Sequence, residues 1–139
     1  MSLRRKAREY ALQILFQYDL VNGNLNEIME EFWKDKRVNS KIVSFCSQLI
    51  NGTIDNLKEI DKCISQHSLN WKLERMSTVD RNILRMATYE LLFQKETPAP
   101  VVINEAIEVA KKFGTEESAK FINGILDAIR RSLEENGKK

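Results

Sequence analysis

The chain has 139 residues, of which 42% are hydrophobic and 30% are charged, a mixture typical of a folded globular domain rather than a disordered chain. The 22 basic and 20 acidic residues leave a formal net charge of +2, which excludes a bulk polycation that binds nucleic acid by charge alone. The 5 Gly and 2 Pro are too few for the many turns of an all-β fold. The two cysteines, Cys46 and Cys63, exclude a disulfide framework and fall on apolar positions typical of buried free thiols. No apolar run approaches the roughly 18 residues of a membrane span, and no secretory signal follows the basic N-terminus. We therefore expect a cytoplasmic protein with no membrane segment.

Apolar residues recur at three- and four-residue steps through most of the chain, which predicts an all-α fold. The first helix begins after the cap residue Ser2 and ends near Val21, where Asn22-Gly23 follows. A short second helix begins after Asn24, which forms a capping-box pattern with Glu27.

A long third helix is predicted next. It begins at Asn39 or Ser40, and its apolar positions extend to Ile64. Gly52 is a weak point inside it, because glycine has a low helix propensity.

The C-terminal part of the chain has equally clear helix signals. Leu73–Met76 predicts a short turn of helix, and Ser77 is the cap of the next helix, which the proline-containing segment 97–100 ends. Gly114 ends the following helix, and Thr115 is expected to cap the last one.

These signals predict about seven helices in two packed halves, each a three-helix-type bundle, within a single domain of residues 1–139. A break at Asn70-Trp71 divides the N-terminal half, 1–70, from the C-terminal half, 71–139.

A cluster of cations is the first candidate functional feature. The four cations lie in the first turns of the predicted first helix, where the macrodipole is already positive. Each cation there is unfavourable by roughly 0.3 kcal/mol or more. A phosphate backbone nearby would turn that repulsion into attraction. The alternative is a solvated cationic start with no ligand. The four cations are Arg4, Arg5, Lys6 and Arg8.

An aromatic residue lies on the same side of the first helix. A helical wheel places Phe16 with Arg5 and Leu12, opposite Ala7 and Ile14. An aromatic beside arginines suits RNA, since bases stack on aromatic rings and phosphates pair with guanidinium groups. The alternative is a helix buried on both sides, with Phe16 in a core.

A second basic and aromatic patch surrounds the turn at Gly114. Lys112 precedes the turn, and Lys120 lies near the start of the last helix, whose free backbone N–H groups can bind an anion. Phe121 lies about 100° from the apolar stripe of that helix, so it can stack on a base. Glu117 would repel phosphate while it satisfies the helix dipole. The alternative is a plain turn with Phe121 at the core margin.

The sequence contains no recognisable enzyme site. His67 is the only histidine, and no phosphate-binding, dinucleotide-binding or nucleophile motif is present. Glu105 and Glu108 are expected on the polar side of their helix, where Glu108 can pair with Lys112. We therefore predict no catalytic residue, no metal site and no cofactor.

Four segments of the chain carry a family resemblance: Arg4–Glu9, Val79–Leu91, Ile103–Gly114 and Lys120–Asp127. Together they resemble the bacterial transcription antitermination factor family NusB. The resemblance implies an all-α fold of two helical halves and an RNA-binding protein that is not an enzyme. It also implies a partner, the small ribosomal-subunit protein NusE. The two proteins would bind the single-stranded boxA element of nascent RNA and promote read-through by RNA polymerase, notably in rRNA operons.

The resemblance also implies site residues by position. The RNA-facing residues would be Arg4, Arg5, Lys6, Arg8, Phe16, Glu117, Lys120 and Phe121, to which we add Lys112. The protein-partner surface would include Glu74, Arg75 and Asp80. Some members of the family are homodimers. Two other functions stay open: a purely protein-binding helical adaptor, and a stand-alone relative of the RNA-binding domain of RNA cytosine methyltransferases.

Overall fold

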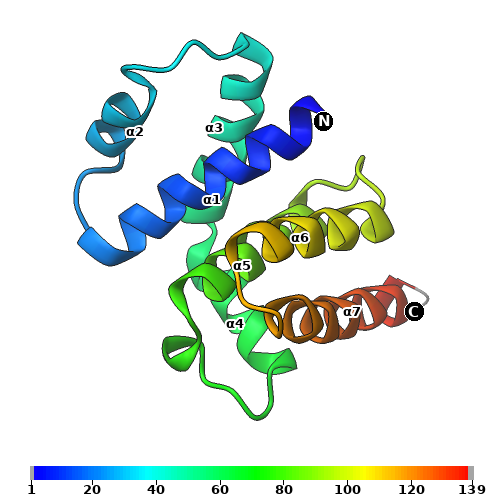
Figure 1. Ribbon diagram of the computed structural model, residues 1–139. Coiled ribbons are helices and arrows are strands. Elements are labelled where there is room, and N and C mark those ends of the chain that lie inside the picture. Colours follow the sequence, from blue (N-terminus) through cyan, green and yellow to red (C-terminus); the bar gives the residue numbers. More distant parts are fainter. Residues whose placement is uncertain (1, 138–139) are drawn as a thin grey trace.

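The computed structural model describes residues 2–137. Within that range it contains seven α-helices, one short 3-10 helix and no β-strand, which confirms the all-α prediction (Figure 1). In chain order the helices are α1 (Leu3–Val21), α2 (Leu25–Trp33), α3 (Ser40–Asp55), α4 (Leu57–His67), the 3-10 helix η1 (Leu73–Arg75), α5 (Thr78–Phe93), α6 (Ala99–Phe113) and α7 (Ser118–Gly137).

Short polar side chains begin three helices as predicted. Each accepts a hydrogen bond from the backbone N–H three residues later, which would otherwise be unsatisfied at a helix start. These caps are Ser2 Oγ, Asn24 Oδ1 and Ser77 Oγ, at 3.1, 3.0 and 3.1 Å from the donor nitrogens. At the other end of α1, Asn22 adopts the left-handed conformation with φ 52° and stops the helix.

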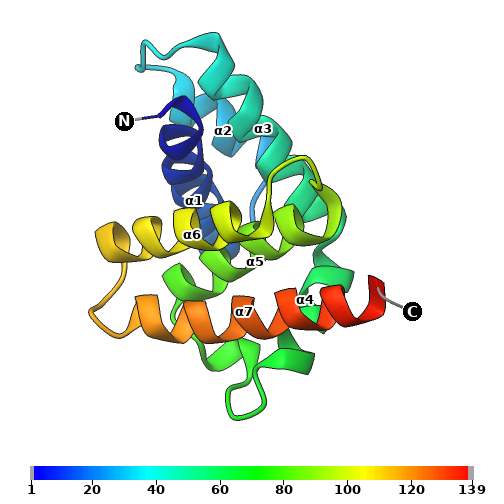
Figure 2. The same cartoon turned by 90° about the vertical axis from the view of Figure 1, so that its right-hand side faces the viewer.

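The prediction of one long third helix is wrong, because the chain forms two helices there, α3 and α4. Asn56 separates them with φ −114° and ψ 20°, outside the helical region. Its side-chain amide donates to the carbonyl oxygen of Gly52 at 2.8 Å, which satisfies a free carbonyl at the end of α3. Helix α4 then packs on α5 and α7 (Figure 2), so residues 57–67 lie with the C-terminal helices.

The last helix begins at Ser118, three residues later than the predicted cap at Thr115. The intervening loop folds back on itself, with the backbone N–H of Thr115 donating to Ser118 Oγ at 2.9 Å. A Cβ atom at Gly114 would collide with the Ser118 side chain, so the close turn requires glycine.

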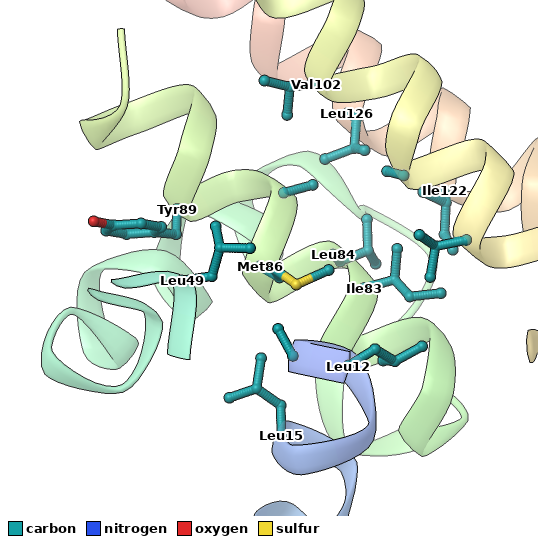
Figure 3. Close-up of a cluster of buried hydrophobic side chains, with 14 of the residues drawn as sticks. Leu12, Leu15, Leu49, Ile83, Leu84, Met86, Tyr89, Val102, Ile122 and Leu126 are labelled. Atoms are coloured by element: carbon teal, nitrogen blue, oxygen red, sulfur yellow. The ribbon is translucent and has the colours of Figure 1, made fainter. Parts of the chain in front are cut away.

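Helix α5 lies at the centre of the molecule. It packs on α1, α3 and α4 and also on α6 and α7, and its buried side chains therefore serve both parts of the core (Figure 3). Each fully buried aliphatic side chain contributes about 1.5–3 kcal/mol relative to its exposed state. This central packing holds the N-terminal helix in a fixed position relative to α6 and α7. Side chains in this cluster include Leu12, Leu15, Leu49, Ile83, Leu84, Met86, Ile122 and Leu126.

The two cysteines are free thiols. Cys46 is fully buried, and burial raises the pKa of its thiol to about 12. Cys63 is only half-buried, so the predicted burial holds fully for Cys46 alone. Among residues 2–137, no helix is both long enough and apolar enough to span a bilayer.

Candidate nucleic-acid interface

Helices α1 and α6 pack against each other and are joined by ion pairs. Arg5 donates to Glu105 through Nη2 at 2.6 Å and through Nε at 3.0 Å. Further along both helices, Lys112 Nζ lies 2.8 Å from Glu9 Oε1. The hydrogen bonds to the Glu105 carboxylate, together with its charge, raise the pKa of Arg5. The packing of α6 across α1 (Figure 2) and these two ion pairs bring the N-terminal cations close to Lys112, which is far from them in the sequence.

Arg8 is buried, in contrast to its predicted role as an RNA-facing residue. Its side chain is 3% exposed and donates to Glu90 through Nε at 2.9 Å and Nη2 at 2.7 Å. A second carboxylate, that of Glu105, lies 3.6 Å from Nη1. Internal acids therefore explain the presence of this cation at the helix start without a phosphate, and we exclude Arg8 from the candidate surface. No local signal in the sequence indicates these partners.

The other N-terminal cations remain accessible. Arg4 is exposed, and its guanidinium carbon lies 5.0 Å from the centre of the Phe45 ring. The Lys6 side chain is 38% exposed and lies 3.9 Å from Glu9. Arg5 retains about a third of its side-chain exposure in spite of its ion pair. Lys112 is half exposed. These four cations can still approach an anion in solvent.

The predicted ion pair between Glu108 and Lys112 does not form. Lys111 pairs with Glu108 at 3.5 Å instead, while Lys112 turns toward Glu9 on α1. Glu105 is also buried rather than on a solvated face, because it lies between the two arginines of α1.

Phe16 is half-buried and forms part of an apolar groove of about 460 Å³. Leu12, on the same side of α1, is 2% exposed, so this part of α1 is buried on both faces as in the alternative interpretation. Phe16 itself faces the groove, together with Phe113 at the end of α6. The complete lining is Leu12, Gln13, Phe16, Gln17, Leu20, Val21, Phe32, Val79 and Phe113.

The turn after α6 leads to a second aromatic patch. Glu117 and Lys120 are exposed and Phe121 is half-buried. The Phe121 ring meets Trp71 edge-to-face, with ring centroids 6.0 Å apart and an interplanar angle of 82°. Both rings line a small pocket of about 230 Å³. The complete lining is Trp71, Arg75, Met76, Ser77, Asp80, Thr115, Glu117, Ser118 and Phe121.

Two of the three predicted partner-binding residues, Arg75 and Asp80, line the same pocket. Glu74 and Arg75 are exposed on η1. Asp80 is only half-buried, but its Oδ1 atom is buried and has no hydrogen-bond partner. The structure therefore joins two sets of residues that the sequence separated into an RNA surface and a protein surface.

Sequence reasoning missed Trp71 as a candidate functional residue and used it only as a helix break. Its position in that break was itself a signal, since an aromatic outside every apolar stripe has no place in the predicted core. It also missed Glu9 and Glu90 as partners of the basic cluster. Their side chains are almost fully buried, which helical periodicity does not predict for charged residues.

Within residues 2–137, no group of three or more His, Cys, Asp or Glu side chains is arranged to hold a metal ion. The accessible chemistry of the surface is that of cations and aromatic rings.

Comparison with known proteins gives a consistent family assignment. The model of the NusB family matches residues 5–131. The transcription antitermination protein NusB of Geobacter sp. (strain M21) is 48% identical over 141 residues, which cover 96% of this chain and 97% of that protein. The NusB protein of Thermodesulfovibrio yellowstonii is 49% identical, with coverage of 92% and 91%.

Solved structures agree with these sequence matches. NusB of T. maritima superimposes with a TM-score of 0.82 at 44% identity and covers 92% of this chain and 90% of its own. A chain from a crystal structure of the antitermination factors NusB and NusE in complex with double-stranded RNA gives a TM-score of 0.86 at 30% identity, with coverage of 95% and 98%.

Proposed function

The chain belongs to the NusB family of transcription antitermination proteins, and on that premise we propose that it binds boxA-type single-stranded RNA together with the small ribosomal-subunit protein NusE. It is a transcription antitermination factor and not an enzyme. In the proposed role, the complex associates with RNA polymerase and promotes read-through of terminators, notably in rRNA operons. Such a role places the protein in the cytoplasm.

One observation carries the RNA part of this proposal. Two basic and aromatic patches, from opposite ends of the sequence, meet neighbouring residues at the start of α5 in the folded chain. The cations of α1 lie beside Lys112 because two ion pairs join α1 to α6. Arg5 pairs with Glu105, and Lys112 pairs with Glu9. Phe113 and Val79 line the groove of Phe16, while the adjoining residues Ser77 and Asp80 line the pocket of Phe121.

The chemistry of this surface suits a single strand. Exposed cations neutralise phosphates, and aromatic rings stack on bases that are not paired with a second strand. Of the residues predicted from the sequence, we retain Arg4, Arg5, Lys6, Phe16, Lys112, Glu117, Lys120 and Phe121 for this surface. We propose Glu74, Arg75 and Asp80 for contact with NusE.

The direct test is a gel shift with boxA RNA, with and without NusE, and with a duplex of the same sequence as a comparison. We expect the single strand to be retarded, and retarded more strongly when NusE is present. If a folded protein retards the RNA in neither condition, the proposed RNA function is wrong. Binding of NusE without any RNA retention would favour a protein-binding adaptor.

Two substitutions test the patch at the start of α7. Phe121→Ala removes an aromatic ring and should weaken RNA binding by about 1–3 kcal/mol, the contribution of one base stack. Glu117→Asn removes an exposed anion and should strengthen RNA binding, because a phosphate no longer meets that charge. If Phe121→Ala leaves RNA affinity unchanged and Glu117→Asn does the same, this patch is not part of the RNA surface.

A further inference from the structure

We propose that Trp71 is an RNA-stacking residue, and that it forms with Phe121 a two-ring site for a single unpaired nucleobase. This inference rests on the proposed RNA-binding function and adds a residue to it. Neither the family match nor the motifs of the sequence assign a role to Trp71.

The first argument is that the fold makes little use of this indole. Trp71 lies between α4 and η1 and is 56% exposed, in a chain that buries most of its large apolar side chains. It is also absent from the buried core cluster and from the partly buried side chains that pack on it. A tryptophan that contributes so little to the core and stays in water is more typical of a binding surface than of a structural position.

The second argument is the geometry of the two rings. Trp71 and Phe121 meet at 82° with their centroids 6.0 Å apart, so they form a corner in one wall of the pocket. A planar base can stack on one ring of such a corner and present its edge to the other, which are the two preferred arrangements of aromatic groups.

The third argument favours a nucleobase over a protein segment. The pocket has a volume of about 230 Å³, below the roughly 300–1,000 Å³ of sites that enclose drug-sized ligands, so it suits one ring system rather than a helix or strand. Exposed cations flank the two rings in the chain and can hold the phosphates on either side of a stacked base. These cations are Lys72, next to Trp71, and Lys120, next to Phe121.

Fluorescence provides a direct test, because Trp33 is the only other tryptophan. Trp33 packs against Tyr10 and Phe32, with ring centroids 5.3 and 5.0 Å away, in a separate aromatic cluster. In the Trp33→Phe variant, Trp71 is the sole tryptophan. We expect its emission to be quenched when single-stranded boxA RNA is added. The matched variant Trp71→Phe, which retains only Trp33, should show little change.

Affinity measurements complete the test. In the full-length protein, Trp71→Ala should weaken binding of labelled boxA RNA about 5- to 150-fold, the loss that corresponds to one base–aromatic stack. Trp71→Phe keeps an aromatic face and should retain most of the affinity. Circular dichroism of each variant shows whether the helices are intact, and the fluorescence titration needs no Trp71 substitution if the alanine variant does not fold.

The outcomes separate this inference from the function on which it rests. Failure of the wild-type protein to bind RNA would overturn the proposed function. RNA binding by wild type with unchanged Trp71 emission and unchanged affinity of folded Trp71→Ala would overturn the role of Trp71 alone. Loss of NusE binding with full RNA affinity in Trp71→Ala would also overturn it, and would assign the indole to the protein interface.

Discussion

Arg8 and Glu90 are 82 residues apart in sequence and form a two-bond ion pair inside the protein. Their side chains are 3% and 2% exposed, and the two hydrogen bonds measure 2.9 and 2.7 Å. The pair joins α1 to the central helix α5. An arginine in the midst of a basic cluster is therefore part of the framework that positions the cluster rather than one of its ligand-binding groups.

We expect Arg8→Ala to destabilise the fold by about 3–5 kcal/mol, because it leaves the Glu90 carboxylate buried without its counter-charge. The measurement is the free energy of unfolding in urea. Arg4→Ala is the control, since an exposed side chain contributes roughly 0.5 kcal/mol or less. The double variant Arg8→Met/Glu90→Leu should lose less stability than Arg8→Ala, because it leaves no buried charge unpaired. Wild-type stability in folded Arg8→Ala would contradict this assignment. This expectation replaces the one that follows from the helix dipole alone, in which loss of Arg8 is neutral or stabilising.

The exposed cations give a prediction on salt dependence. Arg4→Ala combined with Lys6→Ala should weaken binding of boxA RNA and reduce the slope of log affinity against log salt by about 0.7 for each phosphate that the protein no longer neutralises. Fold stability should change little, since neither side chain is buried. Titrations at several salt concentrations measure the slope. A slope equal to that of wild type would remove these residues from the RNA surface.

Local signals predicted the helices well and their contacts poorly. Ser2, Asn24 and Ser77 were correct as caps because a cap bonds to a backbone group three residues away. The break at Asn56 was missed, since apolar residues continue with helical period on both sides of it. Helix α4 packs against α5 and α7, and contacts with such distant parts of the chain are not contained in a local pattern.

The candidate site shows the same division. The residue types at the two basic and aromatic patches were visible in the sequence, and the family resemblance identified their positions. Burial of Arg8 and the approach of Trp71 to Phe121 were not visible, because each depends on a partner more than forty residues away. Charge alone does not distinguish an internal ion pair from an exposed ligand.

The proposed NusE surface is best tested at η1. Glu74→Lys and Arg75→Glu reverse exposed charges, and we expect each to weaken the heterodimer more than it weakens RNA binding by the isolated chain. Calorimetric titration with NusE measures the first effect. Asp80→Lys is a poorer test, because Asp80 Oδ1 is buried and the lysine would strain the start of α5. If both reversals at η1 leave NusE affinity unchanged in folded protein, this surface is not the interface.

The lowered pKa of Asp19 predicts that the folded protein loses stability in acid. Burial raises the pKa of its carboxyl, but hydrogen bonds from Asn82 and Arg81 and the positive charge of Arg85 have the larger combined effect and lower it. A lowered pKa means that the ionised form stabilises the fold. That stabilisation is complete above the unfolded-state pKa of about 3.9 and is lost as the pH falls through the lower value of the folded state.

The comparison that isolates this effect is wild type against Asp19→Asn. We expect the variant to be less stable at pH 7 and the difference between the two proteins to shrink below about pH 4. Urea unfolding at a series of pH values measures the free energy of unfolding of both proteins, and hence the difference between them at each pH. A difference that stays constant down to about pH 2, below the unfolded-state pKa, would show that the ionisation of Asp19 does not contribute.

For Gly52→Ala we predict a change in stability opposite in sign to the one that helix propensity alone would give. It lies in α3 under the ring of Tyr89, and a Cβ atom at this position would overlap that ring. In a solvated helix Gly→Ala stabilises by about 1 kcal/mol, whereas here we expect Gly52→Ala to destabilise by roughly 1–3 kcal/mol, the cost of forcing extra volume into a packed core. Gly124 is the matched control: it lies in α7 with no atom near its Cβ position, so Gly124→Ala should stabilise. The cost of Gly52→Ala should also fall in a Tyr89→Leu background, because the two changes share one contact. Equal stabilisation by both alanines would show that Tyr89 moves aside freely and that Gly52 is not required by its packing.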